Sequence, residues 1–251
     1  MPDALQSLAI VLGVAMLAAA AVVAKGRFFP ADPDEEPRED VAEYISMMVG
    51  VLYALVLGLA LVTVWDTNSQ ASSHVQAEAG ALHEISLLAE TLPPAQRDQV
   101  RTVSEQYAHH VVATEWPRMT SRESLGPEGW TMLDRLRSGT RLPATATPGQ
   151  QLAAQELLSQ LGTLDEARRG READAQSSLS PVLWLGLILG GVLTVAFMFI
   201  FGIQRSFTHV VMVMGLAGLI TFLVLLIHQL DSPFGEVLGT DASAFARYFH
   251  R

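Results

Sequence analysis

The sequence predicts an all-α fold: a polytopic membrane protein with four transmembrane helices and a helical extramembrane domain inserted between the second and third of them. Two observations indicate this class. The chain is 50% hydrophobic and only 17% charged, whereas soluble domains carry about 25% charged residues. The charged residues are also unevenly placed, because they are almost absent from four long apolar stretches and concentrate between them.

The composition argues against several classes of function. The chain contains no cysteine, which excludes disulfides, thiolate metal sites and cysteine nucleophiles. Its net charge of -10 argues against a nucleic-acid partner, because such a partner requires clustered lysines and arginines. The glycine-rich and serine motifs of common enzyme families are missing as well. We therefore expect neither an enzyme nor a bound cofactor.

The first apolar stretch, residues 5–24, contains no charged residue and is followed by Lys25 and Arg27. About 20 apolar residues are enough to cross a bilayer. A cleaved signal peptide is the alternative, but only Asp3 precedes the apolar stretch, where a signal peptide would carry basic residues. We expect a retained span. Residues 30–40, rich in proline, aspartate and glutamate, are expected to form a solvated acidic loop.

The second apolar stretch is residues 45–65, and it also lacks charge. Gly50, Ala54 and Gly58 lie near one face of this expected helix. Small residues at such spacing allow another helix to approach closely, so we interpret these three as helix-packing residues.

The third and fourth stretches are residues 182–203 and 209–227. Pro181 stands at the position where a helix accepts proline most easily, its first turn. A tight turn at residues 206–208 would make the two spans an antiparallel hairpin. Four crossings would then place both termini and the extramembrane domain on one face of the membrane.

The central region is expected to be helical. Val75, Ala79, Leu82 and Ile85 continue the second span with a spacing near 3.5, so this helix should extend beyond the membrane. A later helix should begin at Thr147-Pro148 and lose its apolar face by Arg168. The expected division is 1–65 for the first two spans and the acidic loop, 66–180 for the helical domain, 181–230 for the hairpin, and 231–251 for a C-terminal tail.

Histidines and carboxylates recur in the helical domain. His74, Glu78, His109 and Glu115 could hold a divalent metal, and so support a membrane enzyme, only if they converged in space. The alternative, which we favour, is that they are surface residues or hydrogen-bonded helix contacts, because no metal-binding spacing such as HExxH is present. We expect no metal site.

One side of the second span is a candidate pore lining. Leu57 and Leu61 could form a hydrophobic constriction that gates by dewetting. A ring of Asp66 carboxylates at the pore mouth would attract cations. The alternative is that this side packs against other helices, and the residues alone favour it. The candidate pore-lining residues are Ser46, Gly50, Tyr53, Leu57, Leu61 and Asp66.

Several short strings together resemble a bacterial family of membrane proteins termed bestrophin-like. The resemblance covers the chain from about Val41 onward, and the order of the strings matches. The strings are Tyr53 to Trp65 running into Asp66, Val75-x-x-Glu78-Ala79 with Leu82, Tyr107 with Glu115-Trp116-Pro117, and Leu230-Asp231-x-Pro233-Phe234-Gly235.

The resemblance implies a four-span subunit with its extramembrane domain between spans two and three. Bestrophins proper assemble as pentamers, their second spans line a central ion pathway, and their extramembrane domain and termini face the cytosol. By this analogy we expect a multi-pass protein of the cell membrane: a homo-oligomeric, cation-preferring ion channel whose partners are the lipid bilayer, inorganic ions and further copies of the chain. The alternative is a non-conducting membrane scaffold or sensor that relays a signal through its helical domain.

Overall fold

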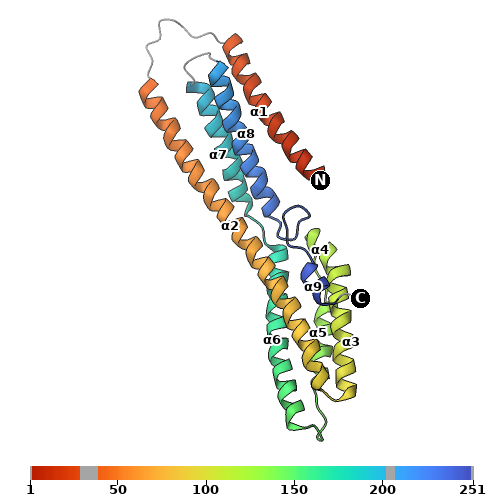
Figure 1. Cartoon of the computed structure of the whole chain (residues 1–251). Coiled ribbons are helices and arrows are strands. Elements are labelled where there is room, and N and C mark those ends of the chain that lie inside the picture. Colours follow the sequence, from red (N-terminus) through yellow and green to blue (C-terminus); the bar gives the residue numbers. More distant parts are fainter. Residues whose placement is uncertain (1, 29–38, 202–206, 250–251) are drawn as a thin grey trace. The chain divides into compact units, whose positions relative to one another are not determined.

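The computed structural model describes residues 2–28, 39–201 and 207–249 (Figure 1). Throughout this part of the chain the regular structure is helical and no strand occurs, which confirms the all-α class. The acidic loop expected at residues 30–40 lies mostly outside the described residues. Of the turn expected at residues 206–208, Phe207 and Thr208 are described, and both belong to the first turn of the helix α8 (Phe207–Leu230). The chain divides into two compact units, which we call the span unit (Met1–Trp65 with Leu179–Asp231) and the helical unit (Asp66–Ser178 with Ser232–Arg251).

The span unit is a group of long apolar helices. Its elements are α1 (Pro2–Phe28), the first part of α2 (Glu39–Leu88), α7 (Pro181–Phe201) and α8 (Phe207–Leu230). Helix α1 packs against α8, where Ala18 meets Val213 and Ala217. Helix α7 packs against α8 as well.

Among the described residues, three helices are long and apolar enough to cross a membrane. They lie within Tyr44–Thr91, Pro181–Met198 and Val210–Leu230. In α1 the apolar stretch found among these residues is shorter, Ala9–Ala18. The span expected at residues 5–24 therefore stays a prediction, although that segment forms a single helix.

The helical unit contains the continuation of α2, which runs as one helix from Glu39 to Leu88. This continuity confirms that the second apolar stretch and the periodic segment after it form one helix. The other elements are a 3₁₀ turn (Ala89–Thr91), α3 (Pro94–His110), a π-helical turn (Val111–Glu115), α4 (Trp116–Thr120), α5 (Glu128–Gly139), α6 (Pro148–Gln176) and α9 (Ser243–Tyr248).

Local sequence sets several of these boundaries. Thr147 caps α6, because its side chain accepts a hydrogen bond from the Gln150 backbone while the Gln150 side chain accepts one from the Thr147 backbone. This reciprocal arrangement satisfies two amide groups that a helix start otherwise leaves unpaired. Pro148 occupies the first turn, as the sequence predicts.

The segment after α8 contributes to the core of the helical unit. From the sequence alone we expect residues 231–251 to form a C-terminal tail. In the structure Phe234 and Phe245 are buried in the same hydrophobic core as Leu82 and Leu157. The side chain of Thr120 donates a hydrogen bond to the Phe234 carbonyl at 3.1 Å, which attaches the segment to α4.

Candidate functional site

Two arginines stand in the apolar stripe of α6. Leu157, Leu161 and Leu164 are buried, and the same helical spacing leads next to Arg168 and Arg171. Both arginine side chains are fully buried. The sequence predicts that this helix loses its apolar face by Arg168, and the leucine spacing does give way to arginines there. The structure shows that the face stays buried and carries guanidinium groups in place of leucines.

Glu78 of α2 is the first carboxylate that pairs with these arginines. Its side chain is fully buried. Arg171 of α6 donates to it through Nε, and through Nη2 at 2.9 Å. Tyr107 of α3 donates its hydroxyl proton to the same carboxylate at 2.5 Å. Glu78 therefore joins α2 to both α3 and α6.

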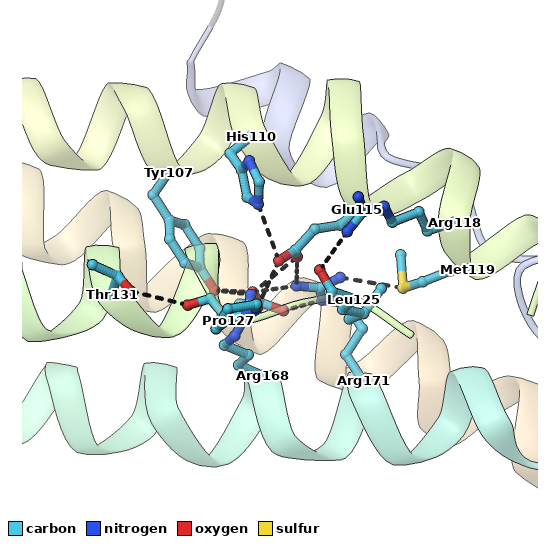
Figure 2. Close-up of polar contacts among 11 residues, drawn as sticks. Tyr107, His110, Glu115, Arg118, Met119, Leu125, Pro127, Thr131, Arg168 and Arg171 are labelled. Atoms are coloured by element: carbon cyan, nitrogen blue, oxygen red, sulfur yellow. Dashed lines mark hydrogen bonds and ion pairs between the residues drawn. The ribbon is translucent and has the colours of Figure 1, made fainter. Parts of the chain in front are cut away.

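Glu115, from the π-helical turn, is the second carboxylate (Figure 2). Arg168 donates to it through Nη1 at 3.0 Å and Nη2 at 2.6 Å, and Arg171 donates through Nη2 at 2.7 Å. Arg168 Nη1 also donates to the Tyr107 hydroxyl at 3.1 Å. The result is one continuous network, which we call the buried charge cluster: Glu78, Tyr107, Glu115, Arg168 and Arg171.

The π-helical turn that carries Glu115 has a local cause. Pro117 lacks a backbone N–H, and in a regular α-helix its ring would clash with the carbonyl four residues earlier. The helix widens just before this proline, and the Trp116 N–H reaches back five residues to the Val111 carbonyl. Such π-helical turns are rare and occur frequently at functional sites.

Two aromatic rings and a glycine surround the Arg168 guanidinium, and a histidine lies beside Glu115. Its Cζ atom lies 5.0 Å from the centre of the Trp130 ring and 5.6 Å from that of Tyr107, which are cation–π distances. Gly129 lies directly against it, since a Cβ atom built there would be 2.2 Å from Arg168 Nη2. His110 Nε2 lies 3.5 Å from Glu115 Oε1.

The cluster balances its own charge, with two carboxylates against two guanidinium groups. Burial alone would raise the pKa of Glu115, but the hydrogen bond from Arg168 and the charges of both arginines outweigh it and lower that pKa. Burial, followed by the charge of Glu78, raises the pKa of Tyr107 well above its ordinary value. Glu115 and Tyr107 therefore keep one protonation state around neutral pH, so the cluster is suited to holding helices together rather than to moving protons.

In the span unit, α2 packs through the side that carries Tyr53 and Leu57. Both residues are buried, against Leu187 of α7 and Ile227 of α8. The Tyr53 ring lies on two glycines of α7: a Cβ atom at Gly190 would be 2.6 Å from the ring, and one at Gly191 would be 2.9 Å from the hydroxyl. Among the described residues, the buried Tyr53 hydroxyl finds no hydrogen-bond partner.

Three other candidate pore residues lie near the side of α2 that carries Tyr53. Gly50 and Ser46 are half-buried, and Leu61 packs partly against the cluster around Tyr53. Of the residues interpreted as helix-packing residues, Ala54 and Gly58 are exposed, and a Cβ atom at Gly50 or Gly58 would meet no described atom within 4 Å.

Asp66 is exposed and does not share the side of Tyr53. Position 66 is about 3.6 turns beyond position 53 on a continuous helix, which puts it on the opposite side. The stripe that leads to Asp66 instead carries Leu55, Leu59 and Val62, which are all exposed. The assignment of Tyr53, Leu57 and Leu61 to a pore stays a prediction, and within the single chain these residues face α7 and α8.

The histidines considered as metal ligands are spread over the helical unit. His74 Nδ1 is 2.6 Å from Asp174 Oδ2, and its ring lies against Gly170, where a Cβ atom would be 2.6 Å away. His83 stacks on Tyr248, and His109 is exposed. Among the described residues no group of three or more histidine, aspartate or glutamate side chains is arranged to hold a metal ion.

The residues that carried the family resemblance gather at three places. Glu78, Tyr107 and Glu115 belong to the buried charge cluster. Trp116 meets Phe234 edge to face at 5.5 Å, next to the buried Pro233. In the span unit Asp231, after α8, accepts a hydrogen bond from the Leu179 backbone at 2.6 Å, just before α7.

Arg168 and Arg171 are the residues of this site that we missed from the sequence. The signal was present: two arginines continue the leucine spacing of α6, and Glu78 and Glu115 occupy apolar positions on α2 and after α3. Charged residues at the buried positions of several helices indicate that the charges pair with one another, since unpaired buried charges are very costly.

Three apolar helices of spanning length and an internally paired helical unit define an α-helical membrane protein. The family model described as the Bestrophin-like domain matches residues 12–245. The chain therefore belongs to the bestrophin-like family, and the resemblance found in the sequence is confirmed. No curated protein and no solved structure matched the chain.

Proposed function

We propose that this chain is the subunit of a homo-oligomeric ion channel whose pore is lined by α2. Membership of the bestrophin-like family is the observation that carries the proposal. By analogy with bestrophins, the assembly is a pentamer in the cell membrane, α1 completes a set of four spans, and the helical unit lies in the cytoplasm.

The environment of α2 supports this role. Among the described residues of its apolar half, the side that carries Tyr53 and Leu57 is the one that α7 and α8 cover. The side that carries Leu55, Leu59 and Val62 is exposed. Many apolar residues on this helix are therefore left for lipid or for other copies. Gly50, Ala54 and Gly58 border the uncovered side and would let a neighbouring α2 approach closely.

We place the uncovered side of α2 toward the pore. Leu55 and Leu59 then form the hydrophobic constriction, and Asp66 forms a ring of carboxylates at one mouth. Such a ring raises the local concentration of cations, so we propose a cation preference. A lining by Tyr53 and Leu57 would require α2 to give up its contacts with α7 and α8.

The first test is the stoichiometry of the detergent-purified protein, measured by mass photometry, combined with single-channel recording in planar bilayers. A closed oligomer that conducts, and whose cation preference weakens in Asp66→Asn, is the expected result. A monomer, or an oligomer without conductance, would contradict the channel proposal. It would favour the alternative of a scaffold or sensor, in which the continuous α2 connects the spans to the helical unit.

The lining is tested separately with thiol reagents, because the chain has no cysteine of its own. Leu59→Cys should react with a membrane-impermeant reagent and lose current when modified. Leu57→Cys is the matched control on the buried side, and it should react slowly. The opposite pattern would restore the lining expected from the sequence.

A further inference from the structure

The contact between α2 and α6 lies in an apolar core of side chains of several sizes. Val75, Ala79 and Leu82 of α2 belong to the same hydrophobic core as Leu161 and Ala175 of α6. Hydrophobic burial is non-directional, so arrangements that differ in the rotation or register of α2 can bury similar apolar area. Hydrogen bonds and ion pairs depend on direction and can distinguish such arrangements.

Directional polar contacts join α2 and α6 at two positions along the helices. Glu78 receives two hydrogen bonds from Arg171, and one helical turn away His74 lies 2.6 Å from Asp174. Two fixed points along a pair of helices determine both their register and their rotation. Tyr107, bonded to Glu78, adds a third fixed point from α3.

The energetics of buried ion pairs point to the same role. Removing charged groups from water costs several kcal/mol for each ion, and this cost can exceed the mutual attraction of the ions. Replacing complete buried pairs by apolar residues is often neutral or stabilising, whereas polar groups in a core can select one arrangement among several.

We propose that the buried charge cluster sets the register and rotation of α2 against α6 and α3, and that it contributes conformational specificity rather than stability. This inference concerns the helical unit and does not depend on the channel proposal. Because α2 continues as one helix into the apolar segment of the span unit, fixing its rotation and register matters for a channel and for a scaffold or sensor alike.

Disulfide trapping in the cysteine-free chain tests the proposal. A Cβ atom at Gly170 would lie 2.7 Å from His74 Cγ, so cysteines at 74 and 170 would have the close Cβ atoms that a disulfide needs. The pair His74→Cys with Gly170→Cys therefore reports the observed register. The pair His74→Cys with Ala167→Cys reports a register shifted by one turn. Both pairs replace His74, so a difference in crosslinking between a native and an altered cluster does not come from the loss of His74.

Each reporter pair is compared in the native cluster and in an apolar cluster: Glu78→Leu, Tyr107→Phe, Glu115→Leu, Arg168→Met and Arg171→Met. We expect the apolar cluster to unfold at a similar or higher temperature. We also expect the ratio of 74–170 to 74–167 crosslinking to fall about tenfold, equivalent to roughly 1.4 kcal/mol of lost preference. An unchanged ratio in a folded protein would overturn the proposal. Failure of the apolar cluster to fold would overturn it too, by showing that the charges are needed for stability.

A second variant, Glu115→Leu with Arg168→Met, removes one carboxylate and one guanidinium together and keeps Arg171 and Tyr107 bonded to Glu78. We expect it to keep the 74–170 preference better than the apolar cluster does, because the contact between Glu78 and Arg171 remains. A loss of preference as large as that of the apolar cluster would contradict the proposed role of this contact.

Discussion

At the scale of single residues, the protein depends on charges that have no access to water. Arg171 is the most connected of them, since it hydrogen-bonds to both buried carboxylates and its Nη1 lies 3.2 Å from the sulfur of Met119. The contribution of each charge to stability depends on the groups that pair with it. Removing one member of the cluster therefore differs sharply from replacing the whole set.

Arg171→Met should destabilise the protein by about 3–5 kcal/mol, because it leaves Glu78 charged, buried and without its main partner. Thermal unfolding of the purified protein, followed by circular dichroism, measures the loss. The control is Arg169→Met on the same helix. The Arg169 side chain is 70% exposed and pairs with Asp165, so it should contribute less than about 1 kcal/mol. Equal losses in the two variants would show that Glu78 has another way to be satisfied.

Glu115 makes stability depend on pH in the acid range. Its pKa is lowered from 4.5 in the folded state, so its contribution is present above that value and is lost as the pH falls through the folded pKa. We expect the melting temperature to fall below about pH 4.5. The fall should be shallower in Glu115→Gln, which has no proton to bind at this position. A variant with the native slope would assign the acid sensitivity to other carboxylates.

At the scale of elements, the Tyr53 ring of α2 can lie directly against α7 because α7 has glycines at that place. Gly190→Ala would place a methyl group 2.6 Å from that ring, so it should lower thermal stability in detergent. Tyr53→Phe should be neutral or stabilising, since no described residue forms a hydrogen bond with the buried hydroxyl. Gly186→Ala is the control on the same helix, because nothing lies within 4 Å of its Cβ position. A destabilised Tyr53→Phe would show that the hydroxyl is hydrogen-bonded after all.

The short helix α9 is attached to the helical unit through Phe245, which is fully buried. Truncating a buried phenylalanine to alanine typically costs about 3–5 kcal/mol. Phe245→Ala should therefore destabilise the helical unit and increase protease cleavage after α8. Arg247→Ala, an exposed neighbour on α9, should behave like the native chain. If Phe245→Ala were equally resistant to protease, α9 would not be a part of the folded unit in solution.

At the scale of the whole molecule, the position of the bilayer can be measured through the four tryptophans. Trp65 and Trp184 lie in the span unit, and Trp116 and Trp130 lie in the helical unit. In single-tryptophan variants reconstituted in brominated lipid, the fluorescence of Trp65 and Trp184 should be quenched, because tryptophan favours the membrane interface. Trp116 and Trp130 should be unaffected. Quenching of Trp130 comparable to that of Trp65 would place the helical unit at the membrane.

The sequence by itself determined the class of this protein, the helices and the family. Long uncharged stretches have few stable forms in lipid other than helices, and the Thr147-Pro148 start of α6 and the extension of α2 follow from capping and periodicity. These features depend on residues close together in the sequence, so they can be predicted from a short stretch of chain. The strings that include Glu78, Tyr107 and Glu115 identified the family for a similar reason, because their order along the chain was sufficient.

Only the tertiary structure decided which groups meet. Periodicity shows that Leu157, Leu161 and Arg168 share a face, but it does not show which helix covers that face, so the pairing of Arg168 with Glu115 needed the fold. The side of α2 that packs inward was hidden for a different reason. A spanning helix is apolar all round, and therefore no polar face distinguishes the Tyr53 side from the Leu59 side. Contacts with α7 and α8, made by residues more than a hundred positions away, resolve that choice.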